Sequence, residues 1–105
     1  MRRRRALRRP GRAEDVLVLP ARLTHEQAGP CSQMLTQALR AQAETAVVAD
    51  AGPLVQFDSS ALAVLLECRR EALGLGKSFS VSRLPARLRE LATLYGVGEL
   101  LPASP

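Results

Sequence analysis

Aromatic residues are scarce in this sequence. Tryptophan is absent, and the only aromatic side chains are those of Phe57, Phe79 and Tyr95, or 3% of 105 residues. Proteins that hold single-stranded nucleic acid commonly use aromatic side chains on which successive bases stack. Three isolated aromatics do not make such a platform, so nucleic acid is not expected as a partner of the folded body.

Histidine and cysteine are scarce as well. His25 is the only histidine, which excludes a histidine-rich metal site. Cys31 and Cys68 are too few and too far apart in sequence to form a disulfide framework or a metal site. Both fall in helical patterns, where a thiol usually acts as a small apolar residue. No metal and no cofactor are therefore expected.

Long apolar runs are also absent. The longest wholly apolar run covers residues 61–66, whereas a helix that spans a bilayer needs about 20 apolar residues. The arginine-rich start continues into Pro10, Gly11 and Arg12 rather than into the apolar region of a secretory signal. We therefore expect a cytoplasmic protein.

Positive charge is concentrated at one end of the chain. The formal net charge is +5, but seven of the fifteen basic residues lie in the first twelve positions, and the remainder carries eight basic and ten acidic side chains. Like charges repel, so residues 1–14 are expected to form a disordered tail before one domain at residues 15–105. Two interpretations stay open: an inert or wrongly assigned start, or an anchor for nucleic acid or anionic lipid.

Beyond the tail, short β-prone runs alternate with helical patterns. This alternation favours an α/β fold with a mainly parallel sheet joined by helical crossovers. The chain length suffices for one such domain. The expected strands cover residues 16–19, 45–49 and 78–82, the later helices cover 61–73 and 85–94, and a short turn covers 97–101.

The first helix is expected to begin at Pro30, because proline is tolerated at the first position of a helix. Residues 21–29 before it form a polar connection, in which a helical turn can already begin. The apolar face of this helix is expected to hold the side chains that follow at helical spacing, namely Cys31, Met34, Leu35, Ala38 and Leu39.

The most informative segment is Asp58-Ser59-Ser60, at a junction between a strand and a helix. Asp58 or Ser59 is suited to cap the helix, because the side-chain oxygens of these residues accept hydrogen bonds from the first helical N–H groups. Two adjacent hydroxyls beside free N–H groups and the positive end of the helix dipole also suit docking or phosphorylation. The residues alone leave both interpretations open: a cap only, or a switch or docking site.

One segment resembles part of a phosphate-binding loop. Gly76-Lys77-Ser78 matches the end of that motif, but Glu71 stands where the motif requires glycine. The motif must also follow a strand and open a helix, whereas here a helix ends and a strand begins. We therefore predict no nucleotide site.

Ser59, His25 and Asp50 supply the three residue types of a hydrolase triad. Nothing in the sequence positions them, however, and the G-x-S-x-G nucleophile motif is absent. No catalytic residue is assigned, and the protein is not predicted to be an enzyme.

The six residues from Phe57 to Leu62 resemble the apolar-Asp-Ser/Thr-Ser/Gly-Gly/Ala-Leu signature of the STAS domain family. They follow a strand ending in Asp50 by about eight residues, and Gly76 precedes the next strand, as in that family. The resemblance covers residues 16–102. It implies a STAS (SpoIIAA-like) fold, which is α/β with a small, mainly parallel sheet and helices packed against it. It also implies that Ser59 occupies the phosphoacceptor position of the sigma-regulating members.

Two branches of the family compete. The ending, with Leu-Ala-x-Leu-Tyr followed by Leu-Pro within residues 91–102, is similar to the small cytoplasmic subunit of the Mla phospholipid transporter, and Pro30 fits that branch. Anti-sigma-factor antagonists more often carry a Leu-Phe-x-x-x-Gly-Leu segment, from which Tyr95-Gly96 departs. In that family an extra strand usually precedes the one at 16–19, and here the arginine-rich tail stands in its place. Two interpretations stay open: a degraded strand that leaves an exposed sheet edge, or a wrongly assigned start. We favour the MlaB-like branch.

The MlaB-like resemblance implies a non-enzymatic protein that binds the ATPase subunit of an ABC transporter involved in phospholipid trafficking and outer-membrane lipid asymmetry. Such a protein would be cytoplasmic and would reach the inner membrane only through its complex. In the alternative, an anti-sigma factor kinase binds the chain and phosphorylates Ser59. The implied contact surface comprises Arg22, Leu23, Thr24, Asp58, Ser59, Ser60, Ala61 and Leu62.

Overall fold

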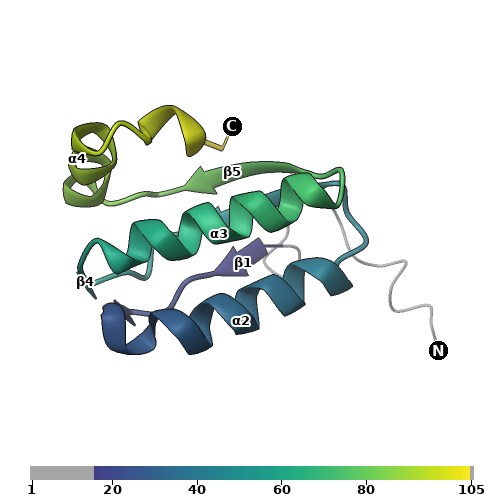
Figure 1. Cartoon of the computed structure of the whole chain (residues 1–105), viewed down its shortest axis with the longest axis horizontal. Coiled ribbons are helices and arrows are strands. Elements are labelled where there is room, and N and C mark those ends of the chain that lie inside the picture. The colour runs from purple at the N-terminus through teal and green to yellow at the C-terminus, as the bar shows by residue number, and fades with distance from the viewer. Residues whose placement is uncertain (1–15, 105) are drawn as a thin grey trace.

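The computed structural model of the chain describes residues 16–104 (Figure 1). The predicted basic tail at residues 1–14 lies outside the described residues.

A three-stranded parallel sheet forms the centre of the described fold. Its strands are β1 (Val16–Val18), β3 (Ala46–Asp50) and β5 (Ser78–Ser82), in the order β1-β3-β5. The helices α2 (His25–Ala41) and α3 (Ser60–Gly74) pack on each other and cover one face of this sheet (Figure 1). The prediction of an α/β fold with a mainly parallel sheet is confirmed.

The last helix stands apart from this pair. α4 (Ala86–Leu94) and the short 3-10 helix η2 (Gly98–Leu100) lie beyond the β5 edge of the sheet (Figure 1). Leu88 and Ala92 of α4 are buried. After η2 the chain returns along β5, where the N–H of Val81 donates to the carbonyl of Pro102 at 2.8 Å.

Buried and more exposed residues alternate along the strands. Successive side chains of a strand point to opposite faces of the sheet, and the two helices cover one of those faces. Every second strand residue faces the helices and is buried, while its neighbours are more exposed. The helices contribute leucines, alanines and both cysteines to the same apolar cluster. The buried strand residues are Leu17, Val47, Ala49, Phe79 and Val81.

A second, very small sheet was not predicted. β2 (Arg22–Leu23) pairs in parallel with β4 (Gln56–Phe57), with Leu23 opposite Phe57. Two-residue strands are too short to show an alternating pattern, so the sequence gives no sign of them. This sheet brings the start of α2 beside the start of α3, because β2 and β4 immediately precede those helices.

The prediction that Pro30 opens the first helix was wrong. α2 begins at His25, and Pro30 lies inside it. Proline lacks the N–H that would bond the carbonyl of Glu26 one turn earlier, and both residues are exposed, so water can serve that carbonyl. The predicted apolar face also needs correction, since Met34 is 56% exposed and Ala38 is exposed, whereas Cys31, Leu35 and Leu39 are buried.

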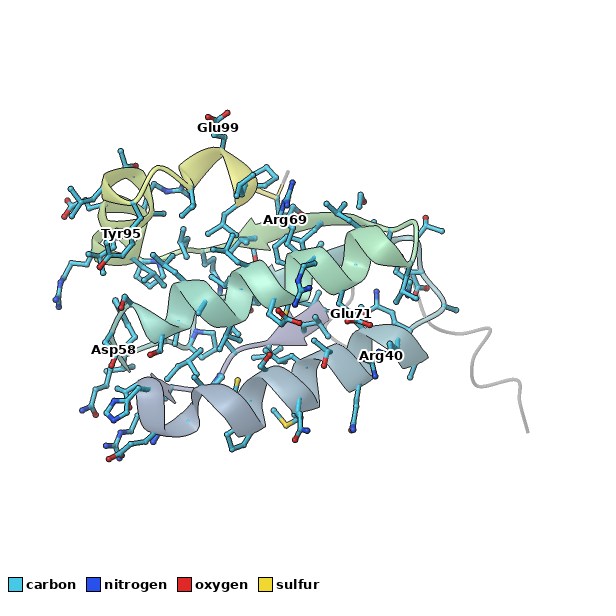
Figure 2. All side chains as sticks on the ribbon, viewed as in Figure 1. Arg40, Asp58, Arg69, Glu71, Tyr95 and Glu99 are labelled. Atoms are coloured by element: carbon cyan, nitrogen blue, oxygen red, sulfur yellow. The ribbon has the colours of Figure 1, made fainter. Side chains whose placement is uncertain are left out.

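Polar contacts tie α2 to α3 and to Lys77, the residue before β5, at the ends of the two helices away from His25 and Ser60. The Arg40 guanidinium on α2 and the Glu71 carboxylate on α3 approach to 2.7 Å and face each other (Figure 2). Lys77 donates from Nζ to the carbonyls of Leu39 and Gln42, at 2.9 and 2.5 Å. These contacts satisfy carbonyls that the C-terminus of a helix leaves without donors. The α2–α3 pair is therefore fixed at this end as well as through its core.

Candidate functional site

A single carboxylate joins the N-termini of the two helices that cover the sheet. Asp58 Oδ1 accepts a hydrogen bond from the N–H of Ser60 at 2.8 Å, which is at the start of α3. Asp58 Oδ2 accepts one from the N–H of His25 at 3.3 Å, which is the first residue of α2. N–H groups at helix starts have no partner within the helix and favour negative charge. Asp58 serves both helices at once.

This arrangement decides which residue caps α3. Ser59 has helical backbone angles, with φ −63° and ψ −14°, and its side chain makes no capping hydrogen bond. The carbonyl of Asp58 already accepts from the N–H of Ala61 at 3.0 Å. Asp58 is therefore the functional cap, and the exposed Ser59 hydroxyl has no part in closing the helix.

The hydrogen bonds to Asp58 also determine the charge of its side chain. Hydrogen bonding from the N–H of Ser60 lowers the pKa of Asp58 from its usual value, and the neighbouring His25 adds to the effect. His25 Nδ1 lies 3.8 Å from Asp58 Oδ2. The surface beside Ser59 therefore presents an ionised carboxylate at neutral pH.

The start of α2 is organised by a second set of polar contacts. Gln27 Oε1 accepts from both the N–H and the hydroxyl of Thr24, each at 2.9 Å. This reach back from the first turn is half of a capping box. Arg22 and Glu26 form an exposed ion pair at 3.4 Å. Arg22 and Thr24 thus lie at the same end of the molecule as Asp58.

The predicted contact residues fall into two groups. Arg22 and Ser59 are exposed, and Thr24, Asp58 and Ser60 are partly exposed, so these five can meet a partner. The other three are buried, with Leu23 and Ala61 at 0% and Leu62 at 3% exposure. The prediction that these three form part of the contact surface is corrected: they belong to the core and hold the surface residues in place.

Two features at this end of the molecule were not foreseen from the sequence. The guanidinium of Arg87 on α4 lies over the ring of Phe57, 5.8 Å from its centroid, which places α4 beside the segment that leads into Asp58. Leu94 and Tyr95, at the end of α4, are 75% and 57% exposed. Tyr95 lies at the same end of the long axis as Asp58 (Figure 2). No sequence pattern links these residues, because the contacts depend on how α4 crosses the sheet edge.

The residues considered for a hydrolase triad are not assembled into one. The Asp50 carboxylate is bound by Arg83, at 2.7 and 3.0 Å, whereas the acidic neighbour of His25 is Asp58. Within residues 16–104, no cluster of three histidine, cysteine, aspartate or glutamate side chains could hold a metal ion. In the same part of the chain, no helix has the length and apolar character needed to cross a membrane.

The capping role of Asp58 leads to a test by substitution. Asp58→Ala removes the acceptors for both helix starts and should lower the melting temperature by several degrees. Asp58→Asn keeps one carbonyl acceptor but loses the charge, so its effect should be smaller. Ser59→Ala should change the free energy of unfolding by less than about 0.5 kcal/mol, since surface substitutions that remove no such feature have small effects. Thermal unfolding followed by circular dichroism measures all three, and a Ser59→Ala loss equal to that of Asp58→Ala would assign the cap to Ser59.

The comparisons with known proteins identify the family. A family model described as "Mlab, STAS domain" matches residues 7–102, most of the chain. The match reaches back to residue 7, ahead of the domain start expected at residue 15. A search of curated proteins finds no significant match. On the strength of the family match and of a fold that agrees with it, the chain belongs to the STAS domain family.

Proposed function

We propose that this STAS protein binds the ATPase subunit of an ABC transporter that moves phospholipids and maintains outer-membrane lipid asymmetry. STAS proteins generally act by binding other proteins rather than by catalysis. The family description points to the MlaB-like branch. The observation that carries the proposal is the Ser59 hydroxyl, which is exposed at a helix start and is not used to cap that helix.

The proposed docking surface consists of Arg22, Thr24, Asp58, Ser59 and Ser60. The two helix starts that present it are held together by the Asp58 carboxylate, so little conformational entropy is lost when a partner binds. Hydroxyl and carboxylate groups give such a surface specificity through hydrogen bonds. Stable interfaces usually also need large apolar anchors, often tyrosine.

Leu94 and Tyr95 supply candidate anchors at the same end of the molecule. Both are large apolar side chains with most of their surface exposed, and α4 contacts Phe57 next to the docking surface. A partner that covered Ser59 and α4 together would bury hydrogen-bonding groups and apolar groups in one interface. The protein would then be cytoplasmic and would be held at the inner membrane only through the transporter complex.

The alternative function is that of an anti-sigma-factor antagonist switched by phosphorylation of Ser59. The exposed hydroxyl favours it, since a kinase could reach that group. The Asp58-Ser59 pair belongs to the signature that both branches share, so it does not separate them, whereas the family description names the MlaB-like branch. We therefore keep transporter binding as the first proposal.

A charge placed at residue 59 tests the docking surface. Ser59→Glu should still fold, because an acidic side chain is favourable at a helix start. Burying its charge against the partner should weaken binding to the ATPase subunit by about a hundredfold or more. Gln37→Glu is the matched control: it adds the same charge at an exposed position of α2, about three turns from His25, and should leave affinity unchanged.

Affinity is measured by titration of the purified ATPase subunit, with circular dichroism of each free variant. Equal affinities for wild type, Ser59→Glu and Gln37→Glu would remove Ser59 from the interface. Recovery of an anti-sigma kinase, and no ATPase subunit, in a co-purification would favour the alternative function.

We also propose that residues 15–105 suffice for binding and that the basic tail is dispensable. The first twelve residues carry seven basic side chains. The rest of the chain carries eight basic and ten acidic side chains, so without the tail its formal charge is only slightly negative. Deletion of residues 2–12 should leave the melting temperature and the affinity for the ATPase subunit close to wild type. A fall of ten degrees or more in the melting temperature would show that this segment contributes to the folded domain.

A further inference from the structure

Arg83 has an unusual backbone conformation. Its φ is 55°, and it is the only non-glycine residue with positive φ among residues 16–104. This left-handed region is disfavoured for any residue with a Cβ atom, and arginine has no compensating local hydrogen bond of the kind that asparagine and aspartate form. Something outside the residue must hold it there.

The Arg83 side chain is held by Asp50, whose carboxylate also accepts from Gly52. Arg83 donates from Nε to Asp50 Oδ1 at 3.0 Å and from an Nη atom to Asp50 Oδ2 at 2.7 Å, which is a two-pronged ion pair. The N–H of Gly52 donates to the same Asp50 Oδ1 at 2.9 Å. A Cβ added to Gly52 would lie 2.3 Å from the Arg83 Cζ, so the guanidinium would have to move from its place over Asp50. We call Asp50, Gly52 and Arg83 the clamp.

The clamp joins two turns at the carboxyl ends of neighbouring parallel strands. Asp50 ends β3, with Gly52 in the turn that leads on to β4, while Arg83 directly follows β5 and leads to α4. β4 continues into Asp58 and Ser59, and Arg87 of α4 lies over Phe57 of β4. The clamp therefore connects the segment that leads to Asp58 and Ser59 of the docking surface to the segment that leads to α4, with Leu94 and Tyr95 at its end.

The clamp contributes little to overall stability. The Arg83 side chain is 67% exposed and the Asp50 side chain 17% exposed. Water therefore screens the arginine end of the ion pair, and two side chains must be ordered to form it, so the gain is limited. The strained backbone of Arg83 works against the folded state. The hydrogen bonds from Arg83 lower the pKa of Asp50, so the ion pair is nevertheless formed at neutral pH. Because the gain from the ion pair is small and the backbone strain of Arg83 opposes it, the main effect of the clamp is to fix the positions of the two turns.

We propose that Arg83 is a positioning residue for partner recognition: clamped onto Asp50 over Gly52, it fixes α4 relative to the Ser59 end of α3. This rests on the proposed function for its effect on binding, but not for its effect on the free protein. Leu94 and Tyr95 can meet the same partner as Ser59 only if α4 is held in this place.

Three variants separate the parts of the clamp. Gly52→Ala keeps both ionic groups and displaces the guanidinium. Arg83→Gly removes the guanidinium and relieves the backbone strain at once. Arg83→Lys keeps the charge but cannot bridge both carboxylate oxygens. Gly74→Ala is the matched control, because a Cβ at that glycine meets nothing within 4 Å.

The first measurement uses the free protein and needs no partner. Amide NMR spectra of Gly52→Ala and Arg83→Gly should show shifts in the first turn of α3 and along α4, with the melting temperature within a few degrees of wild type. Gly74→Ala should shift neither the amides in the first turn of α3 nor those along α4. Shifts confined to residues 50–54 and 82–85 would overturn the proposal, because the clamp would then act only on its own turns.

The second measurement is affinity for the ATPase subunit. Gly52→Ala and Arg83→Gly should each bind at least tenfold more weakly than wild type, Arg83→Lys should fall between, and Gly74→Ala should match wild type. Unchanged affinity in the first two would overturn the role in recognition. Failure of the wild type to bind the ATPase subunit would instead contradict the proposed function, and the NMR spectra would still decide whether the clamp positions α4.

Discussion

The shared carboxylate of Asp58 is the contact on which this end of the molecule depends. Its two oxygens accept hydrogen bonds from the first N–H groups of α2 and α3, and so bring two helix starts to one point. The pairing of Leu23 with Phe57 in the small β2–β4 sheet delivers both helix starts to that point. Because Asp58 caps α3, the Ser59 hydroxyl is left exposed and unused by the helix. Stability and recognition are thereby assigned to adjacent residues.

In the rest of the fold, too, the residues that stabilise the structure differ from those that a partner can contact. Buried leucines such as Leu23 and Leu62 pack beneath the helix starts and are not accessible to a partner. The Asp50–Arg83 ion pair joins a mostly buried carboxylate to an exposed arginine with a strained backbone, and it links the turn before β4 to the turn before α4. A STAS domain that binds a protein benefits from a packed core beneath a surface of fixed shape. A surface that is already ordered loses less conformational entropy when the partner binds.

Sequence reasoning was reliable where a feature repeats along the chain or resides in one short segment. Alternating strands, helical crossovers and the STAS family followed from apolar spacing and from the segment around Ser59. It was wrong at Pro30, because contacts from Asp58 and Gln27 start α2 earlier than local preference suggests. It could not choose between Asp58 and Ser59 as the cap, or find Arg83, since these depend on neighbours distant in sequence. The role of Ser59 in binding stays a prediction.

The central claim is that the partner meets the end of the molecule where α2 and α3 begin. Cross-saturation NMR, with labelled STAS protein and unlabelled ATPase subunit, locates the contact surface directly. The account predicts that saturation reaches Arg22, Thr24, Ser59 and Tyr95 and spares the exposed Leu73 and Leu75 at the other end of α3. Saturation centred on Leu73 and Leu75, with none at Ser59, would contradict it.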